Sequence, residues 1–183
     1  MTEGENTADS NTGNYEELAT ANLDLDVEAR LLESQTECAF IWANREGWPV
    51  GVTMSFLFAR GSFWLTTSGQ RKRVAAVRRD PRVSIVVSSL GSGLPPMKTV
   101  TYKGLCTVHE DRATTEWFLP AFAANLGRGD EEWQKAYIAK LDTPRRVILE
   151  VVPQQRIGFD GDKLYRGADR WAALDETPED PTA

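Results

Sequence analysis

The stretch from residue 66 to 83, TTSGQRKRVAAVRRDPRV, gathers the side chains best suited to hold an anion. It opens with three hydroxyl donors, Thr66, Thr67 and Ser68, and Gly69 then permits a tight turn. Three cations follow where a helix is expected to begin: Arg71, Lys72 and Arg73. Hydroxyl donors, cations and free helix N–H groups together favour a phosphate group. The alternative is a solvated basic face, because cations at a helix N-terminus oppose the helix dipole.

Other residues offer weaker chemistry. His109, the only histidine, precedes Glu110 and Asp111, but a metal site needs several converging ligands and no second histidine or thiolate supports one. A single histidine and the lack of a Gly-x-Ser-x-Gly motif also argue against a hydrolytic triad. Residues 91–93, Gly-Ser-Gly, lead into a Pro-Pro pair and not into a helix, so they predict a plain turn. We expect no metal site.

The pattern around these residues predicts a mainly β protein with helices. β-rich runs predict strands at residues 38–44, 50–58, 62–67, 82–89, 98–109, 145–153 and 155–161. Helical spacing predicts helices at residues 26–34, 70–79, 113–126 and 130–141. Because strands and helices do not alternate one by one, the sheet should be mainly antiparallel, with its first three strands adjacent. Closure into a small barrel would remove the exposed edges.

Particular residues set the expected boundaries of these elements. Asp80–Pro81 ends the basic helix, because proline disfavours helical geometry in the residue before it. Gly104 is expected to bend its strand, and Asp130 to cap the helix that follows it. An Asp-Gly turn at residues 160–161 is expected to precede residues 163–165.

Charge divides the chain into a basic middle and acidic ends. The formal net charge is −6, but residues 1–37 carry ten Asp and Glu against one Arg, and residues 169–183 carry five against one. Residues 38–168 then hold 12 acidic and 19 basic side chains. A basic body between acidic tails suits a small anionic ligand and disfavours nucleic acid. We expect a disordered acidic tail at 1–25, one domain at 26–168 and an acidic C-terminal tail at 169–183.

Composition also narrows the expected location. No apolar run approaches the roughly 18 to 20 residues of a membrane span, and the first residues lack the basic start and apolar run of a secretory signal. Cys38 and Cys106 lie in apolar stretches without metal-ligand or Cys-x-x-Cys spacing, so reduced core thiols are expected. The protein is therefore expected in the cytoplasm, without a membrane or nucleic-acid partner.

The order of these segments resembles the pyridoxamine 5'-phosphate oxidase-like superfamily, including its actinobacterial deazaflavin-using branch. The resemblance covers roughly residues 36–160: a Pro-x-x-x-Thr strand, an aromatic strand ending Thr-Thr, an Arg-Lys-Arg helix start, and Arg-Arg-Asp-Pro-Arg-Val before an apolar strand. The later TVTYKGLCTVHEDR and PRRVILEVVP look like the family's interface half. The resemblance implies an antiparallel, Greek-key-like split β-barrel that forms a homodimer with its cofactor at the interface.

The resemblance also implies which residues bind the cofactor. Lys72 and Arg73, assisted by Arg71, match the cations that hold the cofactor phosphate. Thr66 and Thr67 match the strand end that lies along the cofactor. The strand that lines the flavin ring matches four further residues: Val52, Thr53, Met54 and Ser55.

The implied cofactor is FMN, with the deazaflavin coenzyme F-420 as the alternative. Three more cations would meet the anionic tail of F-420: Arg78, Arg79 and Arg82. The Arg- and Tyr-rich C-terminal motif with which true pyridoxamine 5'-phosphate oxidases grip pyridoxal phosphate is not apparent in GADRWAALDETPEDPTA, which argues against vitamin B6 oxidation. Arg170 and Trp171 in that tail would either fold over the cofactor of a neighbouring subunit or make a docking contact.

Two functions remain open at this point. The first is a flavin- or deazaflavin-dependent oxidoreductase that acts by hydride transfer on an unidentified small molecule. Its cofactor would supply the chemistry, so no catalytic acid or base is obligatory. The second is a non-catalytic split barrel that binds flavin or haem for storage or sensing, although the histidine-rich pattern of a haem site is missing.

Overall fold

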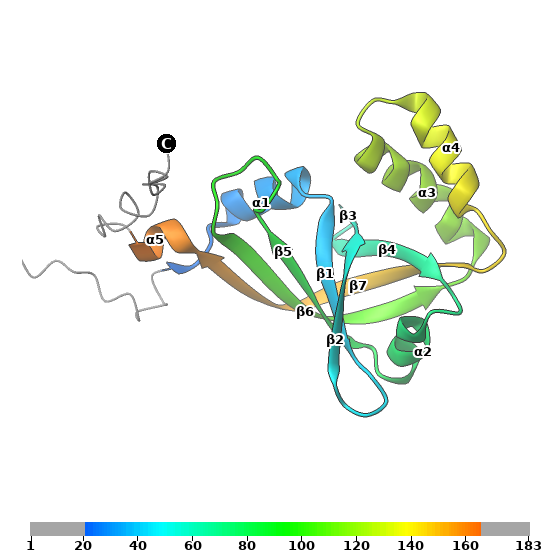
Figure 1. The fold of residues 1–183 in the computed structure, drawn as a ribbon, viewed down its shortest axis with the longest axis horizontal. Coiled ribbons are helices and arrows are strands. Elements are labelled where there is room, and N and C mark those ends of the chain that lie inside the picture. The colour runs from blue at the N-terminus through cyan, green and yellow to red at the C-terminus, as the bar shows by residue number, and fades with distance from the viewer. Residues whose placement is uncertain (1–20, 166–183) are drawn as a thin grey trace, which may run out of the picture.

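The computed structural model describes residues 21–165, which fold around one antiparallel sheet (Figure 1). The strands are β1 (Glu37–Ala43), β2 (Pro49–Ser55), β3 (Leu57–Ala59), β4 (Ser62–Ser68), β5 (Arg82–Ser88), β6 (Lys98–His109) and β7 (Arg146–Asp160). The helices are α1 (Leu25–Ser34), α2 (Lys72–Arg79), α3 (Arg112–Gly127), α4 (Glu131–Leu141) and α5 (Gly161–Tyr165). The expectations for residues 1–20 and 166–183, including Arg170 and Trp171, lie outside the described residues.

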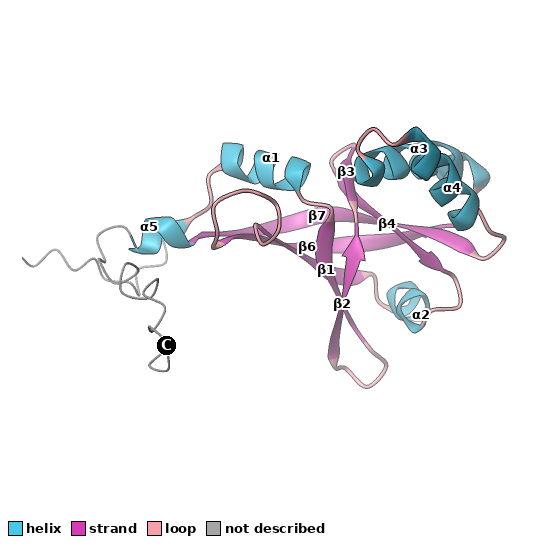
Figure 2. Ribbon diagram, turned by 45° about the horizontal axis from the view of Figure 1, so that its top comes forward, coloured by secondary structure: helices cyan, strands magenta, loops and turns pink. Residues whose placement is uncertain are grey.

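The strands follow the order β2-β1-β5-β6-β7-β4-β3, and every neighbouring pair is antiparallel. The sheet curls, so that β1 and β2 run across the direction of β6 and β7 (Figure 2). The curl brings β2 close to β4, although these two strands share no pairing. The expectation of a mainly β protein with an antiparallel sheet is confirmed, and the curl of the sheet is consistent with the expected split barrel.

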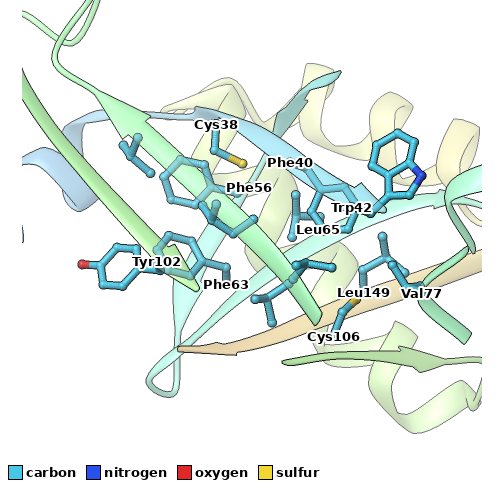
Figure 3. Close-up of a cluster of buried hydrophobic side chains, with 14 of the residues drawn as sticks. Cys38, Phe40, Trp42, Phe56, Phe63, Leu65, Val77, Tyr102, Cys106 and Leu149 are labelled. Carbon is cyan, nitrogen blue, oxygen red and sulfur yellow. The ribbon is translucent and has the colours of Figure 1, made fainter. Parts of the chain in front are cut away.

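Alternate side chains of the strands fill the inside of the curl (Figure 3). The largest fully buried side chains that these strands place inside the curl are Phe40, Phe63, Leu65, Ile85 and Leu149, and Phe56 joins them from the link between β2 and β3. Leu31 of α1 joins this core, as do Val74 and Val77 of α2. Because each buried side chain of this size contributes roughly 1.5–3 kcal/mol, both helices are held firmly to the sheet.

Both cysteines lie in the same core, as expected. Cys38 and Cys106 are buried free thiols. Desolvation by burial raises the pKa of each thiol to about 12, so both stay protonated at neutral pH. Within residues 21–165, no helix has the length and apolar character needed to cross a membrane.

A second apolar cluster joins α3 and α4 to the opposite face of the sheet. Three side chains of α3 pack on Trp64 and Ile148 of strands β4 and β7: Phe118, Leu119 and Phe122. The two helices match their predictions to within a residue. Asp130 caps α4, as expected, by accepting a hydrogen bond from the N–H of Trp133 at 2.9 Å.

The strand predicted at residues 50–58 is instead two strands. β2 ends at Ser55 and pairs with β1, whereas β3 begins at Leu57 and pairs with β4. Between them Phe56 is fully buried, and its N–H donates to the carbonyl of Thr36 at 3.0 Å. The expected adjacency of the first three strands is therefore wrong, because the buried Phe56 carries the chain from one edge of the sheet to the other.

The two strands predicted at residues 145–153 and 155–161 are one continuous strand, β7. It pairs with β6 along its length and with β4 through its first half. Where a break was expected, the register shifts: Lys103 pairs with Gln155 and Gly104 with Pro153. The expected Asp-Gly turn is also wrong, because Gly161 begins α5.

The register shift depends on the missing side chain of Gly104. A Cβ atom there would lie 2.7 Å from the carbonyl oxygen of Val152 and 2.8 Å from Cγ1 of Val151. Both distances are too short for real contacts, and one partner is backbone. Gly104 thus permits the irregular pairing of β6 with β7, as the sequence predicted for a bent strand.

We predict that Gly104→Ala lowers the free energy of unfolding by about 2 kcal/mol, within the range that overpacking costs. The measurement is urea unfolding followed by circular dichroism. Gly51→Ala is the matched control, because a Cβ at this other strand glycine would lie 3.4 Å from Cγ1 of Ile41, an ordinary contact. Equal stability of the two variants would contradict the close approach at residue 104.

Candidate functional site

A fixed turn presents the cation cluster at the end of β4. The N–H of Gly69 donates to the carbonyl of Arg145 at 2.7 Å, and the N–H of Arg71 donates to the carbonyl of Ser68 at 3.0 Å. Nη1 of Arg145 also donates to Oε1 of Gln70 at 2.7 Å. The turn is therefore tied to the start of β7, which determines where α2 begins.

The N-terminus of α2 lacks the usual stabilising acid. Its N-cap residue is Arg71, whose side chain makes no capping hydrogen bond, and its first turn contains no Asp or Glu. The first N–H groups of a helix have no partner within the helix and carry partial positive charge. α3 and α4 differ, because Asp111 and Asp130 accept hydrogen bonds from their first turns.

The three predicted phosphate ligands follow at this N-terminus. Arg71 and Lys72 are exposed, and Arg73 is half-buried. Within residues 21–165, no carboxylate forms an ion pair with any of the three. Burial, followed by repulsion from Arg71, lowers the pKa of Arg73 from its usual value. An anion at this corner would relieve both effects.

Arg73 links this corner to β2. Its Nη1 lies 3.4 Å from the sulfur of Met54, and its guanidinium carbon lies 5.9 Å from the ring centre of Trp42 on β1. The start of α2, which directly follows β4, therefore meets two strands that lie earlier in the sequence, β1 and β2. The structure brings these parts of the predicted site together.

The four predicted residues of β2 divide between two faces. Val52 and Met54 pack against the core, whereas Thr53 and Ser55 alternate with them and point outward. On β4, Thr67 is buried, and Oγ1 of Thr66 donates to the carbonyl of Val147 at 3.0 Å. The contacts of these residues with a cofactor stay a prediction.

The additional cations of α2 and β5 already have partners. Arg78 pairs with Glu110 at 2.7 Å. Arg82 donates from two nitrogens to Asp80, at 2.9 and 2.7 Å, and this hydrogen bonding is the main reason that the pKa of Asp80 falls to about 2. Arg79 donates to the carbonyl of Ala43 at 3.0 Å. These three side chains are less available to an anionic ligand than the cluster at residues 71–73.

His109 belongs to a polar network between the sheet and α3. Its Nε2 lies 2.9 Å from Oε2 of Glu150, and Oγ of Ser62 donates to the other carboxylate oxygen at 3.0 Å. The ring of Trp64 lies beside it, with centroids 5.6 Å apart. This network connects β4, β6 and β7. The part of the chain that the structure describes contains no group of three or more metal-ligating side chains.

Sequence reasoning missed a buried polar group near α1. Glu28 accepts hydrogen bonds from the hydroxyl of Tyr102 and from Nε of Arg156. Glu28 and Tyr102 are 8% and 6% exposed. Tyr102 and Arg156 lie 74 and 128 positions after Glu28 in the sequence, and no local pattern marks them as its partners. The available signal for this group in the sequence was Glu28 itself, a charged residue at the apolar edge of a predicted helix.

Comparisons with known proteins agree with this architecture. A family model described as pyridoxamine 5'-phosphate oxidase matches residues 27–157. The conserved hypothetical protein Rv2991 from Mycobacterium tuberculosis has a TM-score of 0.69 at 19% identity, over 80% of this chain and 90% of that chain. No curated protein matches the sequence.

Two other solved structures are named for a function. An F-420 reductase has a TM-score of 0.55 at 20% identity, over 69% of this chain and 93% of that chain. The haem storage protein HutZ from Vibrio cholerae has a TM-score of 0.56 at 14% identity, over 77% of this chain and 99% of that chain. At these identities the likenesses show the fold alone.

We predict that Lys72→Ala combined with Arg73→Ala weakens FMN binding at least tenfold, because each charge-assisted phosphate contact is worth about 1.5–3 kcal/mol. Fluorescence titration measures the affinity, and thermal unfolding without ligand checks that the fold survives. Arg78→Ala combined with Arg82→Ala removes the same charge from side chains that already have acidic partners, and should change the affinity less than threefold. Unchanged FMN affinity in the variant that lacks Lys72 and Arg73 would contradict their assignment as ligands of the cofactor phosphate.

Proposed function

The chain belongs to the pyridoxamine 5'-phosphate oxidase-like split-barrel superfamily, and we propose that it is a flavin- or deazaflavin-dependent oxidoreductase acting by hydride transfer on a small molecule. The observation that carries the proposal is the corner where α2 begins. It combines three cations without carboxylate partners among residues 21–165, an uncapped helix N-terminus and a direct contact to β2. These features fit a phosphate monoester attached to a ring that lies along β2.

Each residue of this corner has a separate task in the proposal. Lys72 and Arg71 neutralise the phosphate from the exposed side, while Arg73 stays anchored on Met54 and orients it. Thr66 and Thr67 hold the strand end beside it. Thr53 and Ser55 point outward from β2, where the ring would lie. A bound flavin supplies the hydride chemistry, so the protein has to bind, orient and exclude water.

The proposal favours FMN over coenzyme F-420. A longer anionic tail would need cations beyond the first turn of α2, and Arg78 and Arg82 are engaged by Glu110 and Asp80. The cluster at residues 71–73 is sufficient for one phosphate. Because the fold is similar to that of an F-420 reductase, every titration should include the deazaflavin as the competing cofactor.

A second copy of the chain would complete the site on the outward face of the sheet. A row of direct cross-strand partners crosses this face from β2 to β7: Thr53, Ala39, Val86, Thr101 and Ile157. None of these side chains belongs to either core cluster, and Ile157 remains 50% exposed. A hollow of about 380 Å³ continues the face beside Ile41 and Leu105. Small and apolar surfaces of this kind suit a protein interface.

Because Thr53 begins this row, the proposed homodimer places β2 at the interface between copies. The cofactor ring would then lie between one subunit and its partner, which is the arrangement that excludes water from both of its faces.

The alternative function is storage or sensing of haem or flavin without turnover. The likeness to a haem storage protein favours it. However, the chain has one histidine, and His109 is bonded to Glu150 between the sheet and α3. Ligation of a haem iron by His109 would require that ring to leave its carboxylate partner.

We predict that the protein binds FMN more tightly than F-420 or haemin in parallel absorbance titrations. We also predict that the bound, reduced FMN passes its electrons to a quinone acceptor at least tenfold faster than free reduced FMN under anaerobic conditions. Tight binding of haemin without binding of FMN or F-420 would contradict the oxidoreductase assignment and indicate a haem-binding protein. A retained flavin that reacts no faster than free flavin would support storage.

We further predict that Ala39→Arg combined with Val86→Arg converts a homodimer into monomers, because it places four cations in one two-fold interface. The FMN affinity of this double variant should also be at least tenfold lower. Sedimentation velocity measures the oligomeric state, and circular dichroism checks the fold. Glu132→Arg, on the exposed side of α4, is the control and should stay dimeric. A dimer that survives the double substitution would place the interface elsewhere.

A further inference from the structure

A second hollow, of about 570 Å³, lies between α1 and the middle of the sheet. One face of α1 forms a wall with Leu25, Glu28, Ala29, Leu32 and Glu33, which follow helical spacing. The opposite side consists of Phe58 and Gly61 from the β3–β4 hairpin, Tyr102 from β6 and Pro153 from β7. Its volume is that of sites for small molecules.

The floor of this hollow is aromatic. The ring of Phe58 lies 4.8 Å from that of Phe63, which lies 5.0 Å from that of Tyr102. Figure 3 shows the hydroxyl of Tyr102 directed away from Phe63, toward the edge of the cluster. Phe58 remains 37% exposed, so its ring still offers surface to a ligand. A flat apolar body would find contact area here.

The polar groups of the floor are already satisfied among themselves. Glu28 accepts hydrogen bonds from Tyr102 and from Arg156, so its charge has a half-buried counterion. The pKa of Tyr102 is raised, first by burial and then by its hydrogen bond to Glu28, which keeps the hydroxyl protonated as a donor to that carboxylate. This closed group shapes the floor and leaves little net charge on it.

Glu33 gives the hollow its charge. It lies on the wall, and no cation of residues 21–165 forms an ion pair with it. The neighbouring cations have other partners: Arg30 pairs with Asp26, and Arg128 donates to the carbonyl of Ser34 at 2.7 Å. Glu33 therefore places a carboxylate that pairs with no cation of the described residues beside an apolar, aromatic floor.

We propose that this hollow is a second ligand site, for a small molecule with a flat apolar body and one ammonium or amidinium group. The body packs on Phe58 and Leu32, and the cation faces Glu33. The site is separate from the anion corner, since α1 and α2 lie apart, at different ends of the curled sheet (Figures 1 and 2). Residues 1–20 of the chain are disfavoured as occupants, because they carry five acidic residues and no Lys or Arg.

The experiment uses the full-length protein and three probes of one shape: 1-naphthylmethylamine, 1-naphthylmethanol and 1-naphthoic acid. In calorimetric titrations the amine should bind about two- to fivefold more tightly than the alcohol, which is within the worth of one exposed ion pair. The acid should bind more weakly than the alcohol. Equal affinity for amine and acid, or no binding of the three, would overturn the proposal.

Variants assign any binding to this hollow. Glu33→Gln should abolish the preference for the amine and leave the alcohol unchanged, whereas Glu132→Gln, an exposed acid on α4, should change neither. Ala29→Trp fills the hollow from the exposed side of α1 and should weaken both at least tenfold. Probe affinities that are unchanged by Glu33→Gln and by Ala29→Trp would show that the probe binds elsewhere and would overturn the assignment.

Two further variants distinguish this site from the anion corner and from occupation by the C-terminal tail. Lys72→Ala combined with Arg73→Ala should leave all three probe affinities unchanged, so a failure of the cofactor proposal does not affect this one. Arg170→Ala combined with Trp171→Ala tests whether the C-terminal tail, which carries an aromatic and a cationic side chain, fills the hollow instead. Tighter probe binding in that variant would indicate that the C-terminal tail occupies the hollow, and it would overturn the proposal.

Discussion

The positive charge held at the start of α2 is the constraint on which the functional part of the structure depends. Arg73 is half-buried against Met54 and Trp42, and burial and its neighbour Arg71 both lower its pKa. Taking a cation partly out of water without a carboxylate is unfavourable. The cluster cannot move away, because the hydrogen bond from Gly69 to Arg145 fixes the turn before it. The fold therefore maintains an unfavourable arrangement that an anion would improve.

The location of this charge follows from how far the sheet curls. β7 pairs with both β6 and β4, which carries β4 and the start of α2 around the barrel. β2 approaches from the opposite edge of the sheet but does not pair with β4. The opening between these edges is where the side chain of Arg73 crosses from α2 to Met54. The cation corner thus lies at the point where the barrel stays open, and a ligand there has access to both edges.

Local signals predicted the elements well, and long-range pairing did not follow from them. Asp80–Pro81, Gly104 and Asp130 each act within a few residues of their own position, so the helix ends and the bent strand could be read from the sequence. Phe56 acts through burial at the junction of two edges, which no local pattern reveals. Likewise, the cations at residues 71–73 are visible as a cluster, but their contact with β2 depends on the curl of the whole sheet. Glu28 and Arg156 show the same limit for a buried ion pair.

Helix capping distinguishes α2 from the other long helices of this chain. Asp111 and Asp130 cap α3 and α4, and α1 has Asp26 and Glu28 in its first turn. Among the described helices of eight residues or more, α2 has neither a capping side chain nor an acid at its start, and has three cations there instead. A cap is worth about 1 kcal/mol, so its omission together with added repulsion costs stability. Because Val74 and Val77 hold α2 on the core independently, the helix tolerates that cost. An anionic group bound at this N-terminus, as proposed for the cofactor phosphate, would supply the missing negative charge.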